Sequence, residues 1–375
     1  MAGINFSDNI QVKGRELHLQ THWIESGNQI VSTLFDGGRV LSKVVTHHTP
    51  SSEMDELREK IKDIHIENRE SIALLYAIST RVKTVRHARS LHMLGRQFLK
   101  WNLLDEAISE LEFAKQYDPE IEDIYLNLGE AFLKRGGYKE AREILEKGIS
   151  KFSNYADLWH QLGKVYLKEK AFEKAHQTFK KCIQLNNNYA EAYFFLCLCF
   201  LSMLEEKGEN IEINKKQKTL QMAKNHLERT VHLSTRFRTP LIKNAIQRIE
   251  DGRIVDLFNQ LEQTERDLPP YVDLHFHDVF YLEFMYGEKG RDIEMISRYV
   301  TRLEHVLNEN PEYADIHNNL AIGYLIQCRA LFQKALHHFQ NAYEINPDFE
   351  RAKNNYKLAK NDGKGLVILL RALLK

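Results

Sequence analysis

Three glycines recur at a spacing of 34 residues, and their neighbours recur with them. Gly95, Gly129 and Gly163 each follow a leucine and precede an aromatic residue by three positions. Further along each unit come a small and then a bulky apolar residue: Ala107 and Leu111, Ala141 and Leu145, Ala175 and Phe179. A fixed period of this length means that one supersecondary unit is stacked repeatedly, which argues against a catalytic chain.

The spacing inside each unit predicts two antiparallel helices. Leu91, Leu94 and Phe98 lie three and four residues apart, so they share one face of a first helix. The small Gly95 of that helix and Ala107 of the second helix allow a close approach of the two backbones. One such hairpin cannot bury its apolar face alone, so neighbouring hairpins must stack.

This pattern resembles the tetratricopeptide repeat family. Units 88–121, 122–155 and 156–189 carry its Leu-Gly pair, its aromatic residue and its alanine, and Pro119 ends the second helix of the first unit. A last clear unit carries Leu320, Ala321, Tyr324, Ala335, Phe339, Ala342 and Pro347, with a short insertion near Gln327. The resemblance implies a mainly α fold, an α-solenoid of about seven units over 88–349.

Three units between these are less regular. The fourth opens at Tyr193 and closes at Leu227, and a polar insertion at 205–218 is expected to bulge from its turn. Units 238–271 and 272–313 are degenerate; the first has Arg248 where the family has an aromatic residue. Residues 350–375 are expected to form capping helices at the open end of the stack, with a membrane or partner anchor as the alternative.

A different module precedes the repeats. Residues 1–48 alternate apolar and polar side chains in short β-branched runs, and Asp36-Gly37-Gly38 is a strong hairpin signal. These features predict a small antiparallel sheet of three or four strands. Such a sheet has too little core to be stable alone, so it must pack on the next helix or on another copy of itself.

The connecting segment 49–87 predicts one long helix. A capping box at Ser52 and Asp55 opens it, and apolar residues then follow a heptad register that Asn68 interrupts. Two interpretations are open. In the first, which we favour, the helix covers the sheet and the first repeat; in the second, it pairs with a second copy so that residues 1–87 form a homodimer.

Composition restricts the function further. The 52 basic and 52 acidic residues balance, so no overall field attracts nucleic acid or an anionic membrane. The chain has neither an apolar leader nor a run long enough to span a bilayer. The four cysteines, Cys182, Cys197, Cys199 and Cys328, form no Cys-x-x-Cys pair, which suits a reducing cytoplasm.

No catalytic, cofactor or metal site is predicted. Phosphate loops, nucleophile elbows and dinucleotide fingerprints do not occur in the sequence. Of the 17 histidines, His18 and His22 lie about 13 Å apart along a strand, too far to share one ion. His275 and His277, with Asp278, diverge on a helix. An enzyme with a histidine site is a remote option.

The remaining candidate is the inner wall of the solenoid. The resemblance implies that the first helix of each unit lines a concave groove, which would hold Leu99, Lys100, Asn127, Leu133, Lys134, Leu167, Lys168, Phe194 and Leu201. Leucines followed by a row of lysines would suit a peptide with apolar anchors and acidic residues. Alternatively, the helix dipole alone favours lysine at these helix ends. Phe194 and Phe195 are an aromatic anchor pocket or residues of the seam between helices.

The family's carboxylate clamp is not expected, since only Asn127 agrees with it among His92, Arg96, Asn127, Asp157 and Gln161. We therefore predict a cytoplasmic, non-enzymatic adaptor that binds a protein or peptide in its groove. The alternative is a self-associating assembly factor, in which the N-terminal module dimerises and the repeats serve as a spacer.

Overall fold

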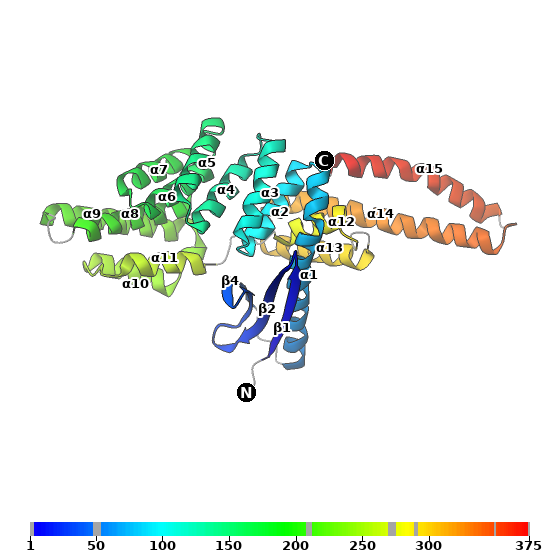
Figure 1. The fold of residues 1–375 in the computed structure, drawn as a ribbon, viewed down its shortest axis with the longest axis horizontal. Helices are drawn as coiled ribbons and strands as arrows, with labels where there is room; N and C mark the ends of the chain where they lie inside the picture. The colour runs from blue at the N-terminus through cyan, green and yellow to red at the C-terminus, as the bar shows by residue number, and fades with distance from the viewer. Residues whose placement is uncertain are drawn as a thin grey trace. The chain divides into compact units, whose positions relative to one another are not determined.

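The computed structural model describes residues 4–47, 54–207, 212–268, 275–288, 292–348 and 350–373. The chain divides into two compact units, Met1–Tyr271 and Val272–Lys375. The first holds the N-terminal sheet, a long helix and the regular repeats, and the second holds four further helices. Figure 1 gives the labels used below.

The N-terminal module is a four-stranded antiparallel sheet in the order β1-β2-β3-β4. Its strands are β1 (Asn5–Val12), β2 (Arg15–Ile24), β3 (Gln29–Asp36) and β4 (Arg39–His47). The β3–β4 turn has positive φ at Gly37 and Gly38, as a two-residue hairpin of the favoured twist requires. The predicted sheet is confirmed, and it has four strands.

Helix α1 (Met54–Val85) packs against β1, β2 and β3, and also against the first repeat helix. The sheet contributes fully buried Leu17, Leu19 and Leu34, and the helix contributes Ile61 and Leu75. The heptad positions of α1 are thus used inside the chain. Asn68, the residue that interrupts the register, donates to the Ser32 hydroxyl of β3 over 2.9 Å.

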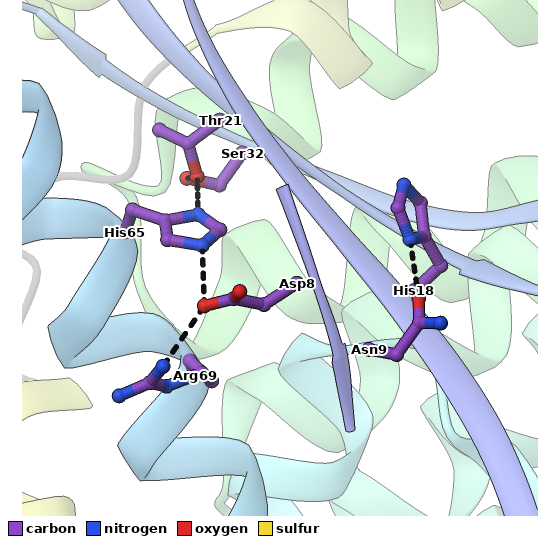
Figure 2. A network of polar contacts seen from close by, with 7 residues as sticks. All are labelled: Asp8, Asn9, His18, Thr21, Ser32, His65 and Arg69. Atoms are coloured by element: carbon purple, nitrogen blue, oxygen red, sulfur yellow. Dashed lines mark hydrogen bonds and ion pairs between the residues drawn. The ribbon is translucent and has the colours of Figure 1, made fainter. Parts of the chain in front are cut away.

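A buried polar network joins α1 to the sheet (Figure 2). His65 is 3 % exposed; its Nδ1 lies 3.0 Å from the Thr21 hydroxyl and its Nε2 3.2 Å from Asp8 Oδ2. Thr21 in turn contacts the Ser32 hydroxyl at 2.9 Å, and Arg69 donates to Asp8 over 2.9 Å. Burial would raise the pKa of Asp8, but the hydrogen bonds from His65 and Arg69 outweigh it and lower this pKa.

The module is also fixed to the first repeat. Glu106, in the second repeat helix, accepts from Arg15 of β2 over 2.9 Å and from the Tyr76 hydroxyl of α1 over 2.6 Å. Glu110, one turn later, is 2 % exposed and accepts from Ser79 over 2.8 Å. The sheet, α1 and the first hairpin therefore form one packed body within the first unit.

Five hairpins follow in the first unit. Their helices are α2 (Ala88–Lys100), α3 (Leu104–Tyr117), α4 (Glu122–Arg135), α5 (Tyr138–Lys151), α6 (Ala156–Lys168), α7 (Phe172–Leu185), α8 (Ala190–Lys207), α9 (Ile213–Leu233), α10 (Pro240–Glu250) and α11 (Leu257–Asp267). Helix pairs pack closely at the repeated glycines, where an added Cβ at Gly129 would lie 2.5 Å from Leu145. The predicted helical solenoid is confirmed.

The polar insertion at 205–218 does not form the expected loop over its described part. Residues 205–207 lengthen α8, and residues 213–218 form the first turns of α9. As a result α8 has 18 residues and α9 has 21, against 13 or 14 in the earlier repeat helices. The polar residues of these helix extensions are exposed, so no apolar surface has to be buried when α8 and α9 are lengthened. Continuing the two helices is therefore favoured over a bulge.

The second unit contains α12 (His275–Tyr286), α13 (Ile293–Glu309), α14 (Ala314–Ile345) and α15 (Glu350–Leu373). The prediction that the last repeat unit is a hairpin with an insertion near Gln327 is wrong, because α14 is one continuous helix of 32 residues. No glycine or proline stands between Gln327 and Ile345, so nothing local stops the helix there. α15 packs on α14.

Candidate partner-binding wall

The first helices of the regular repeats form one side of the solenoid. Helices α2, α4, α6 and α8 contact one another along the array, while each also pairs with its own second helix. Contact between every second helix places these four on the more tightly curved side. We call the surface of α2, α4, α6 and α8 on this side the inner wall.

The predicted leucines lie on these helices but are largely buried. Leu201 is 0 % exposed, Leu99 5 % and Leu167 7 %, and only Leu133 is half-buried. They therefore stabilise contacts between first helices in this structure. A partner would meet the polar residues beside them, together with part of Leu133.

The three predicted lysines lie at the ends of α2, α4 and α6, and all three interact with other groups of the chain. Lys134, 44 % exposed at its side chain, pairs with Glu130 at 2.7 Å. Lys168, 37 % exposed at its side chain, pairs with Glu262 of α11 at 2.5 Å. Lys100 is half-buried at the end of α2. The lysines thus form a row along the wall, and their charge is partly balanced by carboxylates.

The clamp-like positions are occupied by contacts within the repeats. Asn127 donates from Nδ2 to His92 Nε2 over 2.7 Å, which holds His92 as the neutral acceptor. Asp157 accepts from the Tyr189 hydroxyl over 2.5 Å. These contacts leave Asn127 and Asp157 engaged inside the chain, so the site is not a carboxylate clamp.

Phe194 and Phe195 belong to the core of the first unit. Phe194 is 0 % and Phe195 4 % exposed; Phe195 stacks on Phe179 at 5.4 Å between ring centroids. Phe194 meets Phe237 at 5.2 Å. Both phenylalanines are therefore seam residues here, as one of the two interpretations held.

Helix α11 covers the α8 end of the wall. It packs on α8 and brings Leu257 and Leu261 into the same buried cluster as Leu167 and Leu201. With the Lys168–Glu262 ion pair, α11 presents leucines and a carboxylate to the wall from within the chain. Sequence reasoning missed this contact, since the degenerate unit gave no signal of where its second helix would lie.

A second missed feature is a ladder of tyrosine–aspartate contacts between consecutive units. The Tyr155 hydroxyl donates to Asp123, and 34 residues later the Tyr189 hydroxyl donates to Asp157. Burial and the paired carboxylate raise the pKa of both tyrosines, so they stay protonated donors. The equal spacing of these tyrosines and aspartates in the sequence would have been the signal.

Two further features of the described residues concern the requirements of a metal site and of a membrane-spanning helix. Within the described ranges, no three His, Cys, Asp or Glu side chains gather closely enough to hold a metal ion. His18 lies against Asn9 at 2.7 Å, and His277 against the Tyr299 hydroxyl at 2.6 Å. Among the helices described, none combines the length and apolarity needed to cross a bilayer.

Stacked helical hairpins with a polar inner wall define the class of α-solenoid scaffolds. Residues 102–165 and residues 156–189 each match a model of the tetratricopeptide repeat. The chain therefore carries tetratricopeptide repeats across 102–189, which confirms the predicted family. Such repeats serve in general as non-catalytic protein-interaction scaffolds.

Several solved structures resemble parts of the chain. The crystal structure of MamA is 17% identical, with 49% of this chain and 96% of that chain covered and a TM-score of 0.36. For Pseudomonas aeruginosa pilF the identity is 18%, the coverage 64% and 98%, and the TM-score 0.37. YrrB, described as a TPR protein with an unusual peptide-binding site, gives 16%, 52% and 94%, and 0.35. At these TM-scores no partner or site passes from them to this chain. No curated protein matches the sequence.

Proposed function

We propose that this protein is a non-enzymatic adaptor that binds a protein or peptide partner on the inner wall of α2 and α4. Tetratricopeptide repeats are interaction scaffolds in general; the partner and the place of binding are our inference. The uncovered part of the wall carries Arg96, Lys100, Leu133 and Lys134. This combination suits a partner with acidic and apolar side chains.

The contact between α11 and the wall is the observation that carries this proposal. α11 is an amphipathic helix that places Leu261 in the core cluster and Glu262 on Lys168 at 2.5 Å. Lys134 occupies the same repeat position on α4 as Lys168 does on α6. An acidic amphipathic helix from a partner would therefore find, on α2 and α4, the chemistry that α11 finds at the neighbouring unit.

The N-terminal module supports a docking role rather than a coiled-coil dimer. The apolar heptad positions of α1 are buried against the sheet and the first hairpin, and Met54 and Val85 at its ends are the large exposed apolar residues.

The state of the cysteine thiols fits a cytoplasmic location. Cys182, Cys197 and Cys199 are buried and unpaired, and burial raises the pKa of Cys182 to about 12.

Charge reversal on the wall tests the proposal. The double variant Lys100→Glu, Lys134→Glu should lower capture of partner from the native cell lysate about tenfold, since like charges would then meet across the interface. Capture is quantified by mass spectrometry on the full-length tagged chain. Lys168 is left intact, because it holds α11.

A matched control places the same charge change on the opposite side. Lys139 and Lys147 are exposed on α5, a second helix, so the variant Lys139→Glu, Lys147→Glu should capture partner like the wild type. Circular dichroism should be the same for all three proteins. Equal capture by the wall variant and the wild type would rule out this site.

A further inference from the structure

The seam between the two helices of a repeat is fully buried in the regular units. The alanine that begins each second-helix contact, Ala107, Ala141, Ala175 or Ala223, is 0 % exposed. The bulky residue that follows it, Leu111, Leu145, Phe179 or Leu227, is likewise 0 % exposed. Burial at these positions is thus what holds a repeat hairpin closed.

Helix α14 contains both halves of such a seam on one rod. Leu320, Ala321 and Tyr324 occupy first-helix positions, and Ala335 and Phe339 occupy second-helix positions. Because a helix rises about 1.5 Å per residue, Ala321 and Phe339 lie about 27 Å apart along α14. The two halves cannot contact each other within this helix.

Three of the five seam positions of α14 are exposed, whereas Phe339 is half-buried and Leu320 is buried against α13. Ala321 and Ala335 are exposed, and Tyr324 is 46 % exposed. Leu331 at 54 % and Ile345 at 85 % lie on the same face, since at 100° per residue Tyr324, Leu331 and Ile345 fall within about 60° of one another; the exposed His338 lies between the last two. A straight apolar stripe of this length on a helix is normally covered.

The two neighbours of α14 in the second unit cover other faces. α13 packs on the first half of α14, where Ile316 and Leu320 are buried in the cluster with Val300 and Leu303. α15 packs along α14, with Lys353 over the Tyr343 ring at 5.9 Å. In a regular repeat, the first helix packs on the preceding unit and the second helix packs on the following unit. The contacts of α14 with α13 and with α15 correspond to these two. The contact within the unit is the one left unmade.

We propose that a second copy of this chain makes that contact. Two α14 helices, antiparallel and related by a two-fold axis, would pack Tyr324 of each copy against Ala335 and Phe339 of the other, with Leu331 of both copies near the axis. This interface would be the same kind of seam that is buried in the first four repeats. Because each half of the seam is complementary to the other half, one antiparallel pairing covers the exposed seam residues of both copies. An opened hairpin that exchanges its halves is a low-cost route to a dimer.

The proposed axis passes close to a cysteine. In the regular seam Gly95 faces Leu111, and the equivalent pair in α14 is Ala321 and Phe339, whose midpoint is residue 330. Cys328 lies two residues from it and is exposed, whereas the other three cysteines are buried. The two Cys328 thiols of a dimer would thus lie within reach of a short bismaleimide.

The test combines light scattering with cross-linking of the full-length chain. We expect a dimer at tens of micromolar, and a covalent dimer after bismaleimide treatment that Cys328→Ser abolishes. Leu331→Lys should yield a monomer of unchanged helicity, because Leu331 is exposed within one copy and central in the pair. Gln340→Lys, which adds the same charge on the far face of α14, should remain dimeric and cross-link normally.

Three results would overturn the proposal. A wild-type monomer at this concentration would mean that α14 has no partner copy. A dimer that Leu331→Lys leaves intact would place association on another surface, such as residues 1–87. Absence of a Cys328 cross-link in a dimer would exclude the antiparallel register. Partner capture by the inner wall is measured separately, so each proposal can fail without the other.

Discussion

Among individual residues, His92 shows how the repeat stack constrains a titratable group. It is 7 % exposed, and its Nε2 accepts from Asn127 across the contact between α2 and α4. Burial and the nearby Arg96 lower the pKa of His92 to about 4, while Asp123 opposes this shift. His160, enclosed by Phe179, Tyr189 and Phe195, also has its pKa lowered well below the usual value by burial.

These histidines predict a loss of stability in mild acid. The unfolded chain binds a proton on each below about pH 6.5, whereas folded His92 stays neutral until about pH 4. Their contribution is therefore present above pH 6.5 and lost as the pH falls towards 4. His92→Gln keeps an acceptor for Asn127 and should flatten this slope, by up to about 3 kcal/mol between pH 7 and 4. Urea unfolding at three pH values measures it.

The control for this prediction is Lys62→Gln, since Lys62 is exposed on α1 and is not a histidine. Its slope should equal that of the wild type. If His92→Gln retained the full wild-type slope, His92 would not be the group that titrates. The slope that remains in the variant should come from His160, His176 and His226, whose pKa values burial also lowers.

At the level of elements, the contact of α1 with the sheet depends on polar as well as apolar groups. His65→Ala would leave the Thr21 hydroxyl and the Asp8 carboxylate with one partner fewer and would open a cavity beside Ile61. We expect a loss of about 2–4 kcal/mol in the free energy of unfolding. Urea unfolding and limited proteolysis should both respond, with earlier cleavage between the sheet and α2.

Lys62→Ala, on the exposed face of the same helix, should change stability by less than about 0.5 kcal/mol. Equal stability of His65→Ala and Lys62→Ala would show that the network contributes little. The hydrogen bond from Asn68 to Ser32 would then become the candidate for orienting α1 on β3.

The elements differ in how far the sequence predicted them. Residues 88–189 were predictable because each unit supplies the glycine, the alanine and a turn residue, such as Gly136 with its φ of 85°. Asp36-Gly37-Gly38 predicted its hairpin for the same local reason. By contrast, α14 carries the repeat residues Leu320 and Phe339 without a residue that stops a helix between them. Local signals therefore favoured one helix over the family pattern.

The inner wall was less predictable than the helices that form it. Periodicity places Leu99 and Leu167 on first helices, but their burial depends on neighbouring helices that pack against them. The position of α11 depends on the core cluster that Leu261 shares with Leu167 and on the Lys168–Glu262 pair, whose members are distant in the sequence. Such long-range contacts leave no periodic signal, and for that reason the coverage of the wall at α8 could not be anticipated.

For the whole molecule, the separate cores of the two units predict separate unfolding. One core includes Phe179, Phe194 and Leu227, and the other Val300 and Leu303. All three tryptophans, at 23, 101 and 159, belong to the first unit. Tryptophan fluorescence therefore reports on Met1–Tyr271, while far-ultraviolet circular dichroism reports on the helices of both units.

Leu303→Ala should thus shift part of the circular dichroism transition in urea and leave the fluorescence midpoint unchanged. Loss of a fully buried leucine costs about 2–5 kcal/mol, and the loss should be confined to Val272–Lys375. Phe179→Ala is the matched variant, and it should move the fluorescence midpoint instead. Coincident transitions by both probes, shifted together by either substitution, would mean that the two units unfold as one cooperative body.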